Sequence, residues 1–249
     1  AGKAAICPTS RTEQPQAQAK SLKLTEPVVE ASRLYSPQRS HVGRLELDEK
    51  LPPGQVWAKQ WVIYAALGIP DMSPISWRLR VSGLVEREAE YTLEDLEEMA
   101  SVKYVRSFHC VTKWSIKDVE WTGVSLPDLL SKSGVKPEAR WVMFHCLDGY
   151  TAPVPLEDAL HKDAILALKA DGRPLTVEQG YPVRPFIPHL YGWKSAKWLT
   201  EIELLESYVD GYWEMYGYHE RGEVWGEERF KGMVGKHSRR TAYGVLPKV

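Results

Sequence analysis

The sequence predicts an α+β fold, a strand-rich mixed α/β domain with a few short helices. Short runs of β-branched and aromatic residues recur along the chain, and Gly, Pro and Asp separate them. Helical patterns are few and brief, and no regular β–α–β rhythm connects the strands. A chain of 249 residues, 43% of them hydrophobic, is long enough to enclose a sizeable core.

The first predicted elements are a strand, a short helix and a second strand. Trp77–Val81 alternates in polarity as a strand does and ends at a Ser-Gly turn. Thr92–Ala100 is typical of a short helix, because Thr92 can cap the N-terminus and Asp95 stands three residues further on. Val102–Phe108 is rich in β-branched and aromatic residues, which favours a strand.

The later elements alternate between short helices and strands. A helix is expected to start at Ser125 and to end at Gly134. The run from Arg140 to Cys146 is apolar on both faces, which is typical of a buried strand. The same signals predict a turn at Asp148-Gly149, a helix over Leu156–His161, a strand over Ala164–Lys169 with a hairpin turn at Asp171-Gly172, a loop or edge strand around Pro182, Pro185 and Pro188, and a strand over Trp198–Leu205.

Residues 1–45 are predicted to form an extended N-terminal arm, and residues 46–249 a single domain. Thr9–Lys20 is rich in Gln, Ala, Pro and Thr and shows no periodicity, so it offers little apolar surface to bury. Leu51–Gly54 contains two prolines, which favours a stiff loop at the start of the domain. No internal repeat and no strong boundary divides the rest of the chain.

Charge and composition exclude several classes of protein. The formal net charge is −1, so the chain lacks the overall basic field of a nucleic-acid-binding protein. No run approaches the roughly 18 apolar residues of a membrane span. Three cysteines cannot form a disulfide framework. The sequence begins with Ala1 and contains no signal peptide, so it leaves open a cytoplasmic location or a periplasmic one after signal removal.

Cys110 stands two residues after the end of the predicted strand Val102–Phe108. A thiolate at a strand end is held rigidly and can act as a nucleophile or as a soft metal ligand. No second cysteine lies at C-x-x-C spacing, so a zinc or redox pair is not indicated. His109 is a poor general base for Cys110, because adjacent residues of an extended chain point to opposite faces. An isolated buried cysteine would instead be structural.

Two further stretches carry charged and aromatic residues. Arg184, Lys194 and Lys197 lie among Gly, Ser and Trp, and such cations together with free backbone N–H groups can bind a phosphate. The usual nucleotide-binding loops, GxxxxGK[ST] and GxGxxG, are absent from the chain. Trp213–Gly222 is dense in aromatic residues, and we expect it to wrap over the domain, with a pocket rim as the alternative.

The segment Phe108–Ser115, followed by Trp121–Val124, resembles the molybdopterin-binding domain of the sulfite oxidase family. The likeness runs from about Leu51 to Phe230 and looks most like the small bacterial branch that lacks an extra C-terminal dimerisation domain. The combination of Cys-Val-Thr-x-Trp-Ser with a later Tyr-Gly-x-Lys-x-x-Lys is specific. Other matching segments follow in the expected order: Leu79–Val85, Asp148–Tyr150, Gly180–Arg184 and Tyr191–Trp198.

This resemblance implies a set of cofactor-binding residues. The family's molybdenum-ligating cysteine, which is also the catalytic residue, falls on Cys110 here. The family's arginine in Gly-x-Pro-x-Arg falls on Arg184. The phosphate-binding residues fall on Ser195, Ala196 and Lys197. The remaining implied contacts are His109 beside the metal ligand, Gln179 where the family usually has Asn or His, Cys146 at the end of a strand, and Lys59, Trp61 and Val62 early in the domain.

The resemblance also implies a chemistry. It predicts an oxidoreductase with a molybdenum–molybdopterin cofactor that carries out two-electron oxygen-atom transfer on a small oxo-anion such as sulfite, or on a sulfoxide. The electron partner is expected to be a separate haem protein, because the chain has no C-x-x-C-H motif. An anionic substrate requires cations near the metal, and Arg106, Lys113 and His109 are the nearest in sequence.

Two other functions are compatible with the residues alone. The chain could be a cofactor-free binding or scaffold protein that retains the fold, in which case a purified sample would contain neither molybdenum nor pterin. It could also be a cysteine-dependent hydrolase, in which case an acyl substrate would label Cys110 without any metal.

Overall fold

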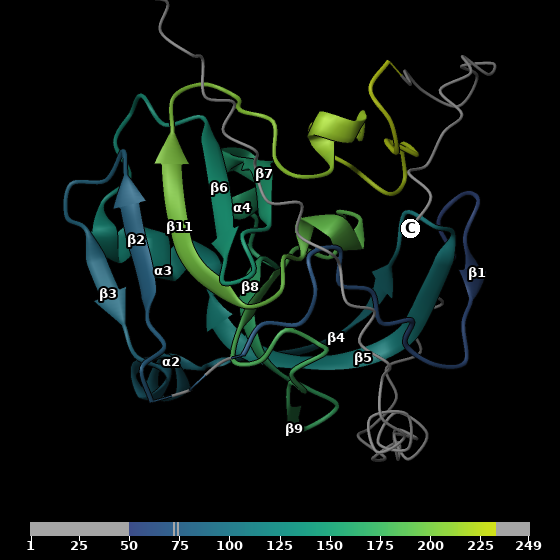
Figure 1. Ribbon diagram of the computed structural model, residues 1–249, viewed down its shortest axis with the longest axis horizontal. Coiled ribbons are helices and arrows are strands. Elements are labelled where there is room, and N and C mark those ends of the chain that lie inside the picture. The colour runs from purple at the N-terminus through teal and green to yellow at the C-terminus, as the bar shows by residue number, and fades with distance from the viewer. Residues whose placement is uncertain (1–49, 72, 74, 233–249) are drawn as a thin grey trace, which may run out of the picture. The chain divides into compact units, whose positions relative to one another are not determined.

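The computed structural model describes residues 50–71, 73 and 75–232, which form two β-sheets with short helices between the strands (Figure 1). The predicted N-terminal arm, residues 1–45, lies outside the described residues and stays a prediction. The strand-rich α+β fold is confirmed, because helices are few and both sheets contain mixed or antiparallel pairings.

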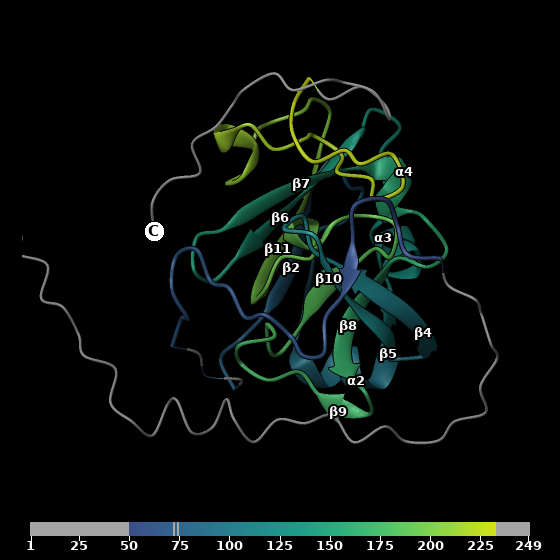
Figure 2. The same ribbon diagram turned by 90° about the vertical axis from the view of Figure 1, so that its right-hand side faces the viewer.

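The first sheet is built around the long strand β5. Its strands are β1 (Val56–Trp57), β4 (Val102–His109), β5 (Trp114–Ser125), β8 (Ile165–Ala170), β9 (Arg173–Pro174) and β10 (Arg184–Phe186). They follow the order β1-β5-β8-β10, while β4 pairs with β5 and β9 with β8. Figure 2 shows β10, β8, β5 and β4 in sequence across this sheet. The β1–β5 pairing is parallel and the other pairings are antiparallel.

The second sheet brings together strands from both halves of the chain. Its order is β3 (Ala89–Tyr91), β2 (Leu79–Gly83), β11 (Leu199–Leu205), β6 (Trp141–Cys146) and β7 (Thr151–Pro155). The β2–β11 pairing is parallel, and the other pairings are antiparallel. Figure 1 shows β2, β11 and β6 upright on the left, with β5 of the first sheet running across the lower part of the view.

Two of the helices begin and end where the sequence predicts. Helix α2 (Leu93–Met99) has Thr92 as its N-cap, and Asp95 completes the capping box. Helix α3 (Leu126–Ser133) starts at Ser125, whose side chain accepts from the Asp128 N–H, and it ends at Gly134 with φ +71°. Helix α4 (Leu156–Ala159) is shorter than expected, and two 3-10 turns complete the set, η1 (Gly192–Lys194) and η2 (Glu214–Tyr216).

Strands β1, β3, β5 and β7 were not predicted, and two of them, β5 and β7, have a local reason. Charged residues interrupt β5, but Gly123 lets it lie against β8, since a Cβ there would stand 1.9 Å from the Leu166 oxygen. Strand β7 contains Pro153 and Pro155, which a central strand excludes. It forms because β7 is the last strand in its sheet and pairs only with β6. Strand β10, with Pro185, ends the first sheet, as the expected loop or edge strand does.

Each sheet has its own buried core. The larger core packs the second sheet against α2 and α3, with Leu79, Phe144 and Ile202 fully buried. The smaller core lies on the first sheet around Trp121, whose ring stacks on Phe186 at 4.2 Å between centroids. Burial of this much apolar surface gives the loops between the strands a rigid base.

Candidate functional site

A cavity of about 410 Å³ lies among loops that are far apart in the sequence. This volume is typical of a small-molecule or cofactor site, which occupies roughly 300–1,000 Å³. The residues that line the cavity come from six segments: 61–66, 108–114, 148–150, 178–184, 192–198 and 213–218. Strands β4, β6, β10 and β11 lead into or out of four of these segments, so the sheets hold the cavity wall in place.

Cys110 lines this cavity from a tight turn between β4 and β5. Its N–H donates to the Trp114 oxygen at 2.9 Å, and its own carbonyl accepts from the Lys113 N–H at 3.1 Å. The Gln55 amide donates to the same carbonyl at 2.9 Å. The side chain is half-buried, with Sγ 3.2 Å from the Thr112 hydroxyl. The backbone is therefore fixed while the sulfur remains open to a ligand.

His109 points away from the cavity, as the alternation of a strand requires. Its Nδ1 lies 2.8 Å from the Ser115 hydroxyl on β5. Burial lowers the pKa of His109 to about 4, so the imidazole is neutral at pH 7. His109 is therefore a neutral core residue behind the turn that carries Cys110.

Arg184 is a buried cation in the cavity wall. Its Nε donates to the Ser195 hydroxyl at 2.9 Å, Nη1 to the Gln179 oxygen at 2.9 Å, and Nη2 to the Ser195 oxygen at 2.6 Å. The guanidinium lies over the Phe108 ring, 5.3 Å from its centroid. Burial lowers the pKa of Arg184 to about 10, which leaves it charged at pH 7. Two of its five N–H groups remain for an anionic ligand.

Lys197 adds a second cation to the same wall. Its Nζ donates to the Tyr64 oxygen at 2.7 Å and to the Glu178 oxygen at 3.0 Å. Burial, with a smaller effect from Arg184, lowers its pKa to about 8, so most of it is protonated at pH 7. The chain can approach so closely because Gly180, at φ +101°, has no Cβ to strike the Lys197 side chain 2.8 Å away.

The structure brings together most of the residues that the sequence indicated. Those that line the cavity are Cys110, Gln179, Arg184, Ser195, Ala196, Lys197, Trp61 and Val62. Three others do not line it: His109, Lys59, which is exposed, and Cys146, which is buried at the end of β6. Burial raises the pKa of the Cys146 thiol, so it stays protonated behind the cavity wall.

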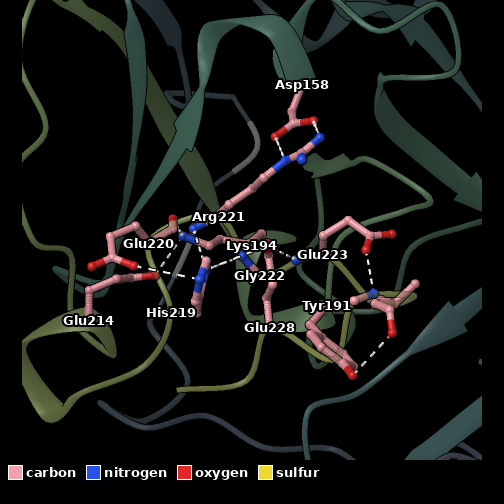
Figure 3. A network of polar contacts seen from close by, with 12 residues as sticks. Asp158, Tyr191, Lys194, Glu214, His219, Glu220, Arg221, Gly222, Glu223 and Glu228 are labelled. Carbon is pink, nitrogen blue, oxygen red and sulfur yellow. Dashed lines mark hydrogen bonds and ion pairs between the residues drawn. The ribbon is translucent and has the colours of Figure 1, made fainter. Parts of the chain in front are cut away.

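The cations nearest to Cys110 in sequence do not face the cavity. Arg106 forms an ion pair with Asp163 at 3.1 Å, and Lys113 is exposed at the turn with φ +75°. Lys194 is buried with Glu214 at 2.7 Å, and its Nζ also donates to the Pro153 oxygen at 2.6 Å (Figure 3). The sequence analysis placed Lys194 with Lys197 as candidate phosphate-binding residues. Of these two lysines, Lys197 lines the cavity and Lys194 does not.

Trp213 and Tyr218 also line the cavity, and the site residues expected from the sequence did not include them. In the sequence, only the density of aromatic residues over 213–222 pointed to them. The alternative expected for this segment, a pocket rim, is the one that the lining by Trp213 and Tyr218 supports. Burial raises the pKa of Tyr218, and the nearby Cys110 thiol raises it further. Tyr218 therefore keeps its proton at neutral pH.

This arrangement defines a class of protein. A half-buried thiol on a rigid turn can ligate a soft metal, and two fixed cations in the same cavity can hold an acidic group. Trp61, which packs against Phe108 at 4.9 Å, supplies a flat apolar wall for a ring system. Together these groups can hold a metal-containing organic cofactor with an acidic end.

Comparison with known proteins identifies the family. The family model described as the oxidoreductase molybdopterin binding domain matches residues 66–213, more than half of the chain. The chain therefore belongs to this family. It is a bacterial-type oxidoreductase of the sulfite oxidase family, and its cofactor is molybdenum–molybdopterin. The resemblance seen in the sequence is confirmed.

The relatives differ in length and in name. The chain is 38% identical to uncharacterized oxidoreductase YuiH of Bacillus subtilis (strain 168) over 73% of this chain and 92% of that protein. It is 33% identical to the putative protein-methionine-sulfoxide reductase subunit YedZ1 of Azospira oryzae over 61% of this chain and 57% of that protein. It is 32% identical to the mitochondrial sulfite oxidase of Drosophila melanogaster over 49% of this chain and 22% of that protein.

A solved structure supports the fold. The sulfane dehydrogenase SoxCD from Paracoccus pantotrophus superimposes with a TM-score of 0.53 and 22% identity, over 79% of this chain and 57% of that one. Within residues 50–71, 73 and 75–232, no helix has the length and apolar character that crossing a membrane requires.

Proposed function

We propose that this chain catalyses two-electron oxygen-atom transfer and that Cys110 is the thiolate ligand of molybdenum. One observation carries the proposal. Of the two cysteines in the described part of the chain, Cys110 lines the cavity and Cys146 does not, and Arg184 and Lys197 line the same cavity. A single protein sulfur beside a cation-lined wall fits a cofactor that brings its own dithiolene and a phosphate.

The residues present fit the cofactor. Arg184 is 5% exposed and retains two N–H groups beyond its three protein bonds, so an anion is the natural partner for this buried charge. Ser195, Ala196 and Lys197 would hold the phosphate with it. Gln179, Trp61 and Val62 would contact the pterin. His109 and Cys146 would act from behind the wall, by bracing the Cys110 turn and by packing near Arg184. Lys59 lies outside the lining and receives no role.

Each residue has a simple task once the cofactor is bound. The molybdenum centre supplies the redox chemistry. Cys110 would hold the metal, and the hydrogen bonds at its backbone keep the turn that carries the sulfur in place. Tyr218, which keeps its proton at neutral pH and lines the same cavity as Cys110, would be available as a hydrogen-bond donor to the substrate. Trp213 and Trp61 exclude water from the reacting atoms.

The substrate class that follows from the relatives' names is a sulfoxide or a small oxo-anion such as sulfite. Electrons would be exchanged singly with a separate haem protein, since this chain has no C-x-x-C-H motif for a covalent haem of its own. The structure disfavours the hydrolase alternative, because no histidine is among the described residues that line the cavity and could serve Cys110 as a base.

The test is a pair of cysteine variants of the holoenzyme. Cys110→Ser is expected to keep the fold and to lose both molybdenum and turnover, whereas Cys146→Ser retains both. Molybdenum is measured by elemental analysis, pterin by fluorescence after oxidative release, and turnover with a dye and either sulfite or methionine sulfoxide. Full molybdenum-dependent activity in Cys110→Ser would exclude the ligand role. An unmodified chain without molybdenum or pterin would favour the scaffold alternative.

A further inference from the structure

Arg229 is a buried cation to which the proposed function gives no task. The residue is 5% exposed, and it is not among those that line the cavity. Its Nη1 donates to the carbonyl oxygen of Val111, the residue after Cys110. Its Nη2 donates to the Pro53 oxygen at 3.2 Å, and the guanidinium lies over the Tyr191 ring, 4.7 Å from the centroid. Because burial of a charge is costly, these contacts indicate which part of the molecule the charge serves.

The charge of Arg229 is only partly offset by a carboxylate. Glu227 Oε1 lies 3.7 Å from Nη2, beyond hydrogen-bond distance, and the Glu227 side chain is 33% exposed. Water screens this exposed carboxylate, whereas it screens the buried guanidinium much less. A net positive charge therefore remains behind the turn that carries Cys110.

Gln55 joins Arg229 in a clamp on this turn. Gln55 is buried, and its Nε2 donates to the Cys110 oxygen at 2.9 Å. Arg229 binds the next carbonyl, that of Val111. The approach is possible because Gly54, at φ +69°, has no Cβ, which would stand 3.2 Å from Nη2 of Arg229. We call Gln55 and Arg229 the turn clamp, since they hold two consecutive carbonyls beside the sulfur.

The turn clamp acts on the proposed metal ligand from outside the cavity. Neither of its members lines the cavity, and neither lies within residues 66–213, the part of the chain that the family model matches. A hydrogen bond from a cation to a carbonyl polarises the peptide, and the cation adds a fixed positive charge next to the turn. Each electron that a metal gains adds negative charge, so a fixed cation nearby favours the reduced metal.

We infer that Arg229 is a positioning residue that raises the reduction potential of the metal centre, with Gln55 sharing its geometric part alone. The inference rests on the proposed function, because it requires Cys110 to hold the metal. In each step the metal gains one electron and the haem protein, its proposed partner, loses one. Arg229 fixes the turn through Val111 and stabilises the added charge. Gln55 fixes the same turn but carries no charge, so the two members of the clamp separate geometry from charge.

The first experiment measures the molybdenum potential of holoenzyme variants by redox titration at a single pH, with EPR detection of the one-electron-reduced metal. Arg229→Gln removes the charge and is expected to lower the midpoint potential by at least about 59 mV, a tenfold change in the equilibrium constant. Arg229→Lys keeps the charge without the planar fork, and Gln55→Met removes a donor without a change of charge. Both are expected to change that constant by less than about threefold.

Arg140→Gln is the matched control. Arg140 is exposed and lies outside the cavity lining, and its Nη1 donates to two backbone oxygens, those of Pro137 at 2.6 Å and Ala139 at 2.7 Å. Its replacement is expected to leave the potential unchanged. An unchanged potential in Arg229→Gln would overturn the inference, and so would an equal fall in any of the other three variants.

A second change of charge covers the case in which Arg229→Gln does not retain molybdenum. Glu227→Gln removes the carboxylate that offsets the cation and leaves the clamp intact, so it is expected to raise the potential. A fall or no change in that variant would contradict the inference. Elemental analysis of Cys110→Ser identifies failure of the proposed function, since retained molybdenum there overturns both. Loss of molybdenum from Cys110→Ser, together with an unchanged potential in Arg229→Gln, overturns the inference alone.

Discussion

Replacement of Lys194 by methionine is expected to destabilise the protein far more than its sequence position suggests. The Nζ of Lys194 and the carboxylate of Glu214 are 2.7 Å apart, and the two side chains are only 1% and 0% exposed. Lys194 also donates to the backbone oxygens of Pro153 and Glu220, and Trp193 donates to Glu214 at 2.8 Å. Lys194 and Glu214 thus tie β7 and η1 to the segment that carries Trp213 and Tyr218. Figure 3 shows Lys194 with Glu214 and Glu220.

The expected loss of unfolding free energy in Lys194→Met comes from the buried carboxylate of Glu214, which is left without a cation. Without Lys194, the buried Glu214 carboxylate keeps the Trp193 donor but loses its cation, and removal of one partner of a buried pair costs about 3–5 kcal/mol. For a chain of this length each kcal/mol lowers Tm by roughly 2–4 °C, so we expect a fall of about 6–20 °C. Lys231→Met is the matched control, because its pair with Asp210 is about one-third exposed and should contribute less than about 1 kcal/mol.

The assay is urea unfolding followed by tryptophan fluorescence. It covers Lys194→Met, Glu214→Gln, the double variant that combines them, and the control Lys231→Met. Removal of both charges is expected to cost less than Lys194→Met alone, since no uncompensated charge remains. A loss below about 1 kcal/mol for Lys194→Met would refute the argument. So would a double variant whose loss equals the sum of the two single losses within about 0.5 kcal/mol, because that result means the two groups are uncoupled.

Three further predictions follow from single sites. Gly123→Ala should destabilise the fold by roughly 2–4 kcal/mol in the same unfolding assay, because its Cβ would overlap the Leu166 oxygen of β8; wild-type stability would contradict the 1.9 Å contact. His109 has a pKa of about 4 when folded against 6.5 when unfolded, so its stabilising effect is present above pH 6.5 and is lost as the pH falls toward 4. The loss in unfolding free energy is on the order of 3 kcal/mol. In His109→Gln the unfolding free energy should depend less steeply on pH between 6.5 and 4. An unchanged pH dependence would argue against a neutral buried imidazole. Arg184→Gln should lower the bound pterin, measured by fluorescence after oxidative release, by at least about tenfold, while the control Arg106→Gln retains it; equal pterin in both variants would remove Arg184 from the site.

Local signals in the sequence determined the elements and the position of Cys110. Thr92 and Asp95 predicted the start of α2, and Gly134 predicted the end of α3, because helix caps depend on residues within a few positions of one another. The motif around Cys110 likewise predicted the family. Strands β5 and β7 were missed because they are strands only in the context of their neighbours. Strand β5 pairs with β8, which Gly123 allows to approach closely. Strand β7 pairs with β6 at the edge of its sheet, where Pro153 is tolerated.

Only the tertiary structure decided which side chains meet in the cavity. Lys194 and Lys197 stand three residues apart in one basic stretch, yet one is neutralised by Glu214 in the core and the other faces the cavity. Tyr218, far along the chain from Cys110, becomes its neighbour. Composition and spacing describe contacts within a few residues, whereas these contacts depend on how the two sheets and the C-terminal segment pack. The sequence by itself therefore determined the family and singled out Cys110, and the packing determined which charged side chains line the cavity with it.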